Sequence, residues 1–92
     1  MAHTIREKEQ LLARVRRIQG QLAGIERALE AERDSYLILQ TVAACRGALN
    51  GLMAEIIEGH IRFHVFDPRR RWTTSQAEAG QELIDIVKTF LR

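Results

Sequence analysis

Apolar side chains recur at helical spacing through the middle third of the chain, from residue 35 to residue 65. The repeating positions are Leu39, Val42, Leu49, Leu52, Met53, Ile56, His60 and Phe63. The Asn50-Gly51 dipeptide is typical of hairpin turns, but the period on both sides of it is near 3.6 rather than 2, which predicts one continuous helix. About thirty residues at 1.5 Å each give a helix of about 45 Å. Because a compact chain of this length has a radius of gyration near ~12 Å, the helix is too long for a compact monomer.

Shorter helices are expected on either side. Residues 4–31 combine a capping box at Thr4 and Glu7 with an apolar stripe, and residues 75–91 open with a second capping box at Ser75 and Glu78. Between the first two helices, Asp34 or Ser35 is the expected N-cap of the long helix. The sequence therefore predicts an all-α chain of three helices, about 4–31, 35–65 and 75–91, forming a single helical domain over residues 1–92.

The long helix carries an unusually broad apolar surface. Its apolar residues occupy more than one stripe, which favours burial against partner subunits. Glycine pairs at Gly20/Gly24 and Gly47/Gly51 cost roughly 1 kcal/mol per residue inside a helix. They indicate either close approach of another helix or tolerated weak points. We expect an obligate helical oligomer, a dimer of dimers.

Composition excludes several classes of protein. With 46% hydrophobic and 28% charged residues, the chain is too apolar to be disordered. No apolar run approaches the ~18 residues of a membrane span, and the first residues lack the apolar core of a signal peptide, so a cytoplasmic protein without a membrane partner is expected. A single cysteine, Cys45, excludes an internal disulfide. No nucleophile–base pair or phosphate loop is recognisable, so the chain is not expected to be an enzyme.

Positive charge is concentrated on the first helix. Residues 10–25 contain three arginines and no acid, and Arg14 and Arg17 share a helix face while Arg16 points elsewhere. The run Arg69 to Arg71 adds a second basic cluster. Guanidinium groups suit phosphate oxygens and guanine edges, so the face indicates DNA, with a solvated helix face as the alternative. No helix-turn-helix is visible.

The histidines suggest a metal. His60 and His64 lie four residues apart, on one helix face. Removal of Met1 would expose the Ala2 α-amine beside His3, and amine, amide and imidazole nitrogens suit Ni(II) or Co(II). The alternative is a solvated histidine pair. Cys45 lies fifteen helical residues from His60, about 22 Å, so it is expected to be a small buried hydrophobe.

A further ligand is expected from a second copy. If two long helices pair antiparallel about a two-fold axis near Leu49, His60 and His64 meet positions 34 to 38 of the partner. Asp34, Ser35 or Tyr36 of that copy would then face the histidines.

Three runs resemble the CsoR/RcnR/FrmR family of small bacterial repressors. They are "HTIREKEQLLAR", "VRRIQGQLAGIERALE" and "LQTVAACRGALNGLMAEIIEGHI". The resemblance implies all-α, disc-like tetramers without a helix-turn-helix, which bind operator DNA when free and release it when an inducer binds. It implies Arg14, Arg17 and Arg46 as DNA-contacting residues. It also implies an antiparallel dimer in which position 35 of one subunit faces positions 60 and 64 of the other.

Within that family the inducer follows the residues at positions 3, 35, 60 and 64. Nickel and cobalt sensors resemble His-Cys-His-His, and this chain has His3, Ser35, His60 and His64. The pattern of copper sensors has cysteine at 64, and formaldehyde sensors use a cysteine at 35. The resemblance therefore implies a repressor of metal efflux genes released by Ni(II) or Co(II), with Zn(II) binding possible in vitro. The alternatives are a non-metal inducer such as formaldehyde, or a variant whose sensing is disabled by Ser35.

Ser35 itself is open to three interpretations. It is an introduced cysteine-to-serine change, or a natural residue with a shifted metal preference or a different inducer, or only the N-cap of the second helix with sensing lost. At a metal site, a serine in this position would leave a ligand set of nitrogen and oxygen only.

Overall fold

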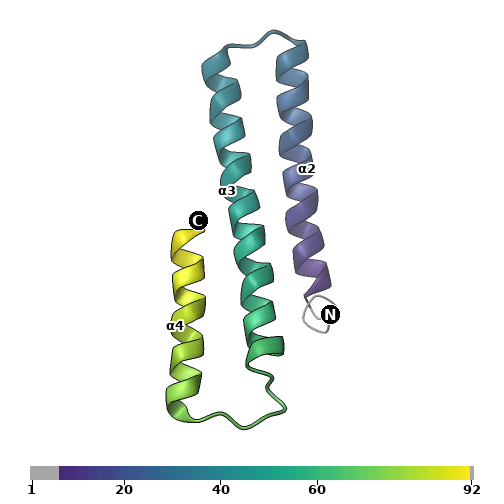
Figure 1. Ribbon diagram of the computed structural model, residues 1–92. Helices are drawn as coiled ribbons and strands as arrows, with labels where there is room; N and C mark the ends of the chain where they lie inside the picture. Colours follow the sequence, from purple (N-terminus) through teal and green to yellow (C-terminus); the bar gives the residue numbers. More distant parts are fainter. Residues whose placement is uncertain (1–6, 92) are drawn as a thin grey trace.

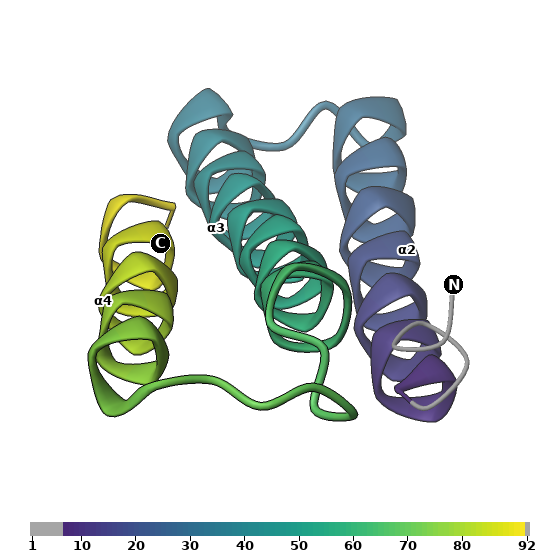
Figure 2. The ribbon, with the colours of Figure 1, turned by 60° about the horizontal axis from the view of Figure 1, so that its bottom comes forward.

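The structure is a computed structural model that describes residues 7–91. It contains helix α2 (Lys8–Glu30), helix α3 (Ser35–His60), the short π-helix η1 (Ile61–Val65) and helix α4 (Thr74–Phe90), with no strand in the described range. The α2 and α3 helices form an antiparallel hairpin, and α4 runs back along the lower part of α3 (Figure 1). Figure 2 shows α3 between the other two helices. The expected all-α, three-helix fold is confirmed.

The first described helix has a well-defined beginning and end. Its N-cap is Glu7, with φ −100° and ψ 9° and no side-chain capping bond, so α2 itself begins at Lys8. Thr4 itself lies outside the described residues. At the other end, the amide of Glu32 donates to the carbonyl of Leu29 and that of Arg33 to the carbonyl of Ala28. These two bonds form a Schellman motif with Glu32 in the left-handed conformation at φ 54°.

The long helix runs where the periodicity predicts. The Asp34 carboxylate accepts a hydrogen bond from the Tyr36 amide at 3.3 Å, so Asp34 is the N-cap and Ser35 is the first helical residue. The interpretation of Ser35 as an N-cap was therefore wrong. The helix continues through Asn50-Gly51, but its last turn widens into η1, closed by a bond from the Phe66 amide to the Ile61 carbonyl.

The third helix is capped two residues earlier than expected. The Thr73 hydroxyl accepts from the Gln76 amide at 3.1 Å, and the Gln76 side chain accepts from the Thr73 amide at 2.9 Å. This reciprocal pair is a capping box, so the predicted box at Ser75 and Glu78 was wrong in register. Both pairs satisfy the same sequence rule, and the structure has the cap at Thr73. In the loop before this helix the Trp72 indole donates to the Asp67 carbonyl at 2.8 Å.

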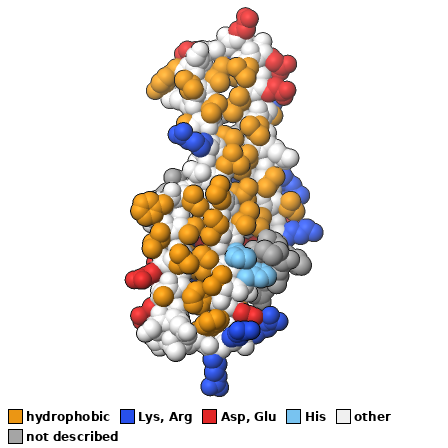
Figure 3. All heavy atoms as spheres, viewed as in Figure 1, with side chains coloured by type: hydrophobic (Ala, Val, Ile, Leu, Met, Phe, Trp, Pro, Cys, Tyr) orange, Lys and Arg blue, Asp and Glu red, His pale blue; other side chains and the backbone are white. Residues whose placement is uncertain are grey.

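One layer of helices gives the chain little interior. Its extents are 57 × 24 × 11 Å and its radius of gyration is 17.4 Å, against ~12 Å for a compact chain of this length. The buried apolar residues are Ile18, Cys45, Ala54, Ile61 and Ile84. Figure 3 shows apolar side chains along the whole length of one face. The exposed apolar residues of α3 are Tyr36, Leu37, Leu39, Val42, Leu49, Met53 and Ile56.

One helix is also long and apolar enough to cross a membrane, judged by length and composition alone. Within the described residues it is the continuous segment Ser35–Val65, whose mean hydropathy over 18 residues is 1.2, although the sequence contains no uninterrupted apolar run of that length. The core helix of a soluble protein meets the same test.

Candidate functional site

The two neighbouring histidines lie side by side at the end of the long helix. His60 is the last residue of α3 and His64 lies in η1, and their rings are stacked with centroids 5.1 Å apart and planes inclined by 14°. Both residues are exposed. The prediction that they share one face is confirmed. Histidines four residues apart on one face are a common pair of metal ligands, and π-helical turns occur often at functional sites.

The other predicted ligands do not join this pair within one chain. Ser35 stands at the opposite end of α3, twenty-five helical residues or about 37 Å from His60. Ala2 and His3 lie outside the described residues. Within residues 7–91 no group of three or more His, Cys, Asp or Glu side chains is placed to hold a metal ion. The described chain therefore supplies two imidazoles, and a metal ion bound to them would need its other donors from elsewhere.

Cys45 does not contribute to this site. It is 5% exposed, in the middle of α3, and the prediction that it is a small buried hydrophobe is confirmed. Its burial also keeps the single thiol of the chain away from reagents in solution.

The basic face of α2 lies next to α3. Arg14 and Arg17 both line a cavity of about 130 Å³, together with Ile18, Gln21 and Ala48, so the shared face predicted for the two arginines is confirmed. Arg46 is exposed on α3. The Gln21 side-chain oxygen is buried and has no hydrogen-bond partner among the described residues. One polar atom in the wall of this small cavity is therefore left without a hydrogen bond by the described part of the chain.

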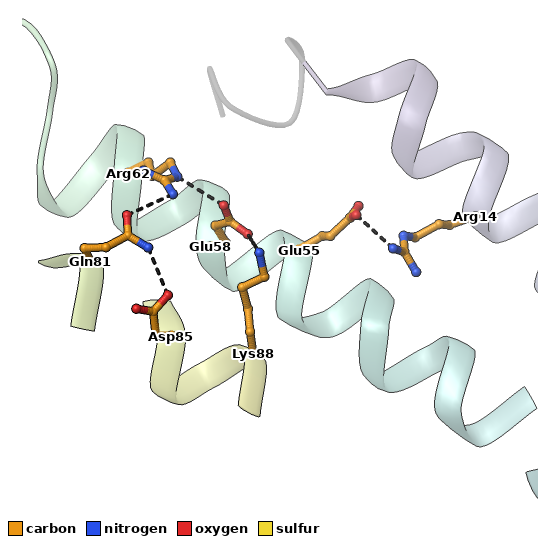
Figure 4. Close-up of polar contacts among 7 residues, drawn as sticks. All are labelled: Arg14, Glu55, Glu58, Arg62, Gln81, Asp85 and Lys88. Atoms are coloured by element: carbon orange, nitrogen blue, oxygen red, sulfur yellow. Dashed lines mark hydrogen bonds and ion pairs between the residues drawn. The ribbon is translucent and has the colours of Figure 1, made fainter. Parts of the chain in front are cut away.

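Arg14 is held by a residue that the sequence did not reveal. Its Nη2 donates to Glu55 Oε1 at 2.9 Å, joining α2 to α3 (Figure 4). Both side chains are 34% exposed. Arg17 and Arg46 make no ion pair within the described part of the chain. Because Arg14 and Glu55 are separated by 41 positions, no local pattern predicts their contact.

A second polar cluster connects the end of α3 with α4. Glu58 pairs with Arg62 at 3.1 Å and with Lys88 at 3.4 Å, and Arg62 also donates to Gln81 at 3.2 Å. The Gln81 amide in turn donates to Asp85 at 3.0 Å (Figure 4). The Glu58–Arg62 pair has the i, i+4 spacing of helical ion pairs and is readable from the sequence. This cluster fixes α4 against the segment that carries the histidines.

The second basic run is partly neutralised. Arg69 forms hydrogen bonds with both carboxylate oxygens of Asp67, the shortest at 2.8 Å. The side-chain hydrogen bond from Arg69 lowers the pKa of Asp67 to about 2, with a further contribution from the Arg69 amide. Arg70 and Arg71 remain exposed. The run is therefore a weaker cationic surface than its three arginines suggest.

An all-helical chain with an arginine face and an exposed histidine pair fits a DNA-binding regulator. Comparison with known families shows that the chain belongs to the metal-sensitive transcriptional repressor family, whose profile matches residues 7–89. The resemblance to CsoR, RcnR and FrmR is thereby confirmed. Members of this family are transcriptional repressors, so they bind DNA and are not enzymes.

Individual relatives support this assignment. The chain is 55% identical over 93 residues to an uncharacterised protein in the bioA 5′ region of Serratia marcescens, covering 100% of both chains. It is 46% identical over 65 residues to a transcriptional repressor RcnR homologue of Escherichia coli O139:H28, covering 71% of this chain and 72% of the relative. Among solved structures it is similar to a glutamate-to-histidine variant of the formaldehyde-responsive regulator FrmR from Salmonella enterica serovar Typhimurium. That structure has a TM-score of 0.65 and 38% identity, with coverage of 95% of this chain and 96% of the other.

Proposed function

We propose that this protein is a cytoplasmic repressor that binds operator DNA in the absence of metal and releases it when Ni(II) or Co(II) binds, so that metal efflux genes are expressed. The observation that carries the proposal is the exposed, stacked pair His60 and His64 in a chain of the metal-sensitive repressor family. The similarity to an RcnR homologue supports the same class.

The proposed metal ligands are His60 and His64 together with His3, the Ala2 amine and Ser35 of a second copy. Imidazole and amine nitrogens suit Ni(II) and Co(II), and Zn(II) is expected to bind the same donors in vitro. A bound metal would supply a cationic centre that holds nitrogen ligands from separate segments together. Because a neutral serine hydroxyl is a poor ligand, we expect weaker binding than at a site with a thiolate in its place.

The proposed assembly is an antiparallel dimer that pairs again into a disc-like homotetramer. The uncovered apolar face of α3 supports it, since burial of apolar area drives most protein association. In such a dimer the beginning of one α3 helix faces the end of the other. Ser35 of the second copy would then lie beside His60 and His64, which are too far from Ser35 of their own chain.

Arg14, Arg17 and Arg46 are the proposed DNA contacts. Several copies of this arginine set in a symmetric assembly would give a strong, salt-dependent affinity for the duplex. Because the N-terminal segment leads directly into α2, holding that segment at the histidines would change the placement of Arg14 and Arg17. Coupling of this kind is typically 1–3 kcal/mol per site, and it is reciprocal, so DNA should weaken metal binding by the same factor.

A formaldehyde-responsive repressor is the second candidate. The structural similarity to a formaldehyde-responsive regulator favours it. Formaldehyde sensing requires an exposed nucleophile, and a thiolate is the most reactive one available in proteins. This chain has serine at position 35 and buries its single thiol, Cys45. These two features favour a metal ion over formaldehyde as the inducer.

The decisive experiment follows fluorescence anisotropy of a duplex taken from upstream of the gene, during titration with Co(II). The unmodified chain, Ser35→Cys and the double variant His60→Ala/His64→Ala are compared, and formaldehyde replaces metal in a parallel series. We expect Co(II) to release DNA from the unmodified chain, and at lower concentration from Ser35→Cys, whereas the histidine variant stays bound. Release of the unmodified chain by formaldehyde but not by metal would overturn the proposal in favour of the second candidate.

A further inference from the structure

Arg14 occupies a notch between α2 and α3. The wall of the notch on α3 is formed by Gly51 and Glu55, one helical turn apart. A Cβ atom at Gly51 would lie 2.8 Å from Arg14 Nη1, closer than real contacts allow. The missing side chain at Gly51 therefore gives the guanidinium room to reach Glu55.

The pairing distinguishes Arg14 from the other proposed DNA contacts. Arg17 and Arg46 are exposed, and between residues 7 and 91 neither has a carboxylate partner. Arg14 is held at 2.9 Å from Glu55, yet both side chains keep 34% of their surface in solvent. The guanidinium is therefore occupied but remains accessible to an anion from outside.

A carboxylate and a phosphate use the same donors of a guanidinium. Each accepts short, charge-assisted hydrogen bonds from its N–H groups. If a DNA phosphate joined Glu55 at Arg14, two negative charges would lie a few ångströms apart, and like charges at that range repel each other. Exchange of the carboxylate for the phosphate is thus favoured over sharing.

We propose that Glu55 is an internal competitor for DNA: it holds Arg14 in the free protein, must be displaced when a phosphate binds, and so lowers the affinity for operator. This inference rests on the proposed role of Arg14 as a DNA contact. Glu55 is a positioning residue in this scheme, because it acts only through Arg14.

The test compares three variants by anisotropy titration of operator DNA without metal, at low and moderate salt. Glu55→Gln removes the competing charge. Glu58→Gln removes the same charge one turn further along α3, where the partners are Arg62 and Lys88, and so controls for net charge. We expect Glu55→Gln to bind about two- to five-fold more tightly than Glu58→Gln for each copy in contact, the range of an exposed ion pair. The difference should shrink as salt rises.

The third variant, Arg14→Ala, identifies the route of the effect. In an Arg14→Ala background, Glu55→Gln and Glu58→Gln should bind DNA equally, because the guanidinium for which Glu55 competes is no longer present. Circular dichroism and size-exclusion chromatography establish that each variant keeps its fold and assembly. If Arg14→Ala weakens binding while Glu55→Gln matches Glu58→Gln or binds less tightly, only this inference is overturned. If Arg14→Ala leaves binding unchanged, the proposed DNA contact is wrong as well.

Discussion

At the level of single residues, Glu32 has a backbone conformation that does not suit its side chain. Its φ of 54° lies in the left-handed region, and no other non-glycine residue from 7 to 91 has a positive φ. The Schellman motif that ends α2 requires this conformation, since Glu32 and Arg33 both donate back into the last turn. The turn between α2 and α3 is therefore formed with some strain.

Replacing Glu32 with glycine should relieve that strain. A residue with a Cβ atom in the left-handed region destabilises the folded state by roughly 1–2 kcal/mol. Glycine removes this cost, but its larger entropy in the unfolded chain offsets roughly 0.4–1 kcal/mol of the gain. We expect Glu32→Gly to raise the free energy of unfolding by about 0.5–1 kcal/mol, measured by urea denaturation at fixed protein concentration. The control is Glu30→Gly, in the last helical turn, which should lower it. A lower free energy of unfolding in Glu32→Gly would contradict the claim that Glu32 is strained.

At the level of elements, substitutions at the N-terminus of α4 can show which residue caps it. Thr73 accepts from the Gln76 amide, whereas Ser75 lies inside the helix. Loss of an N-cap hydroxyl costs typically ~1 kcal/mol. We expect Thr73→Ala to lower stability by about that amount and Ser75→Ala to change it by only a few tenths, both followed by thermal denaturation. The reverse order would show that the capping box lies at Ser75 and Glu78 after all.

The helices themselves were predictable because each depends on a local pattern. The period of the apolar residues placed all three helices and predicted the long helix correctly through Asn50-Gly51. The errors lie at helix ends, where several residues satisfy the same rule. Thr73 and Ser75 both head a capping box that fits the sequence rule, so the rule alone does not distinguish them. The π-helix at residues 61–65 has no sequence signature and was missed.

The candidate site was predictable to the same extent. The pair His60 and His64 follows from helical spacing alone, as does the shared face of Arg14 and Arg17. Contacts between helices follow no such rule, so Glu55 at Arg14 was missed. The predicted roles of His3, Ala2 and Ser35 depend on parts of the assembly beyond one described chain, and they stay predictions.

At the level of the whole molecule, the apolar face of α3 should be the contact between subunits. Leu39 is 63% exposed in the single chain, and burying a leucine side chain contributes roughly 1.5–3 kcal/mol. We expect Leu39→Glu to weaken association at least about tenfold, seen as smaller species in sedimentation velocity at micromolar concentration. Gln40→Glu, an exposed polar neighbour with the same final side chain, should leave the assembly intact. Equal behaviour of the two variants would exclude Leu39 from the interface.

The 11 Å thickness of the helical layer has a further consequence in the cell. In the proposed assembly, a subunit buries most of its apolar surface only when it associates with other copies. Dilution therefore lowers its stability, as a mild denaturant does. Mass action then links folding to abundance, and freshly synthesised chains at low copy number are open to proteolysis until partners accumulate. Repression would therefore begin above a threshold concentration of the repressor, rather than rise in proportion to that concentration.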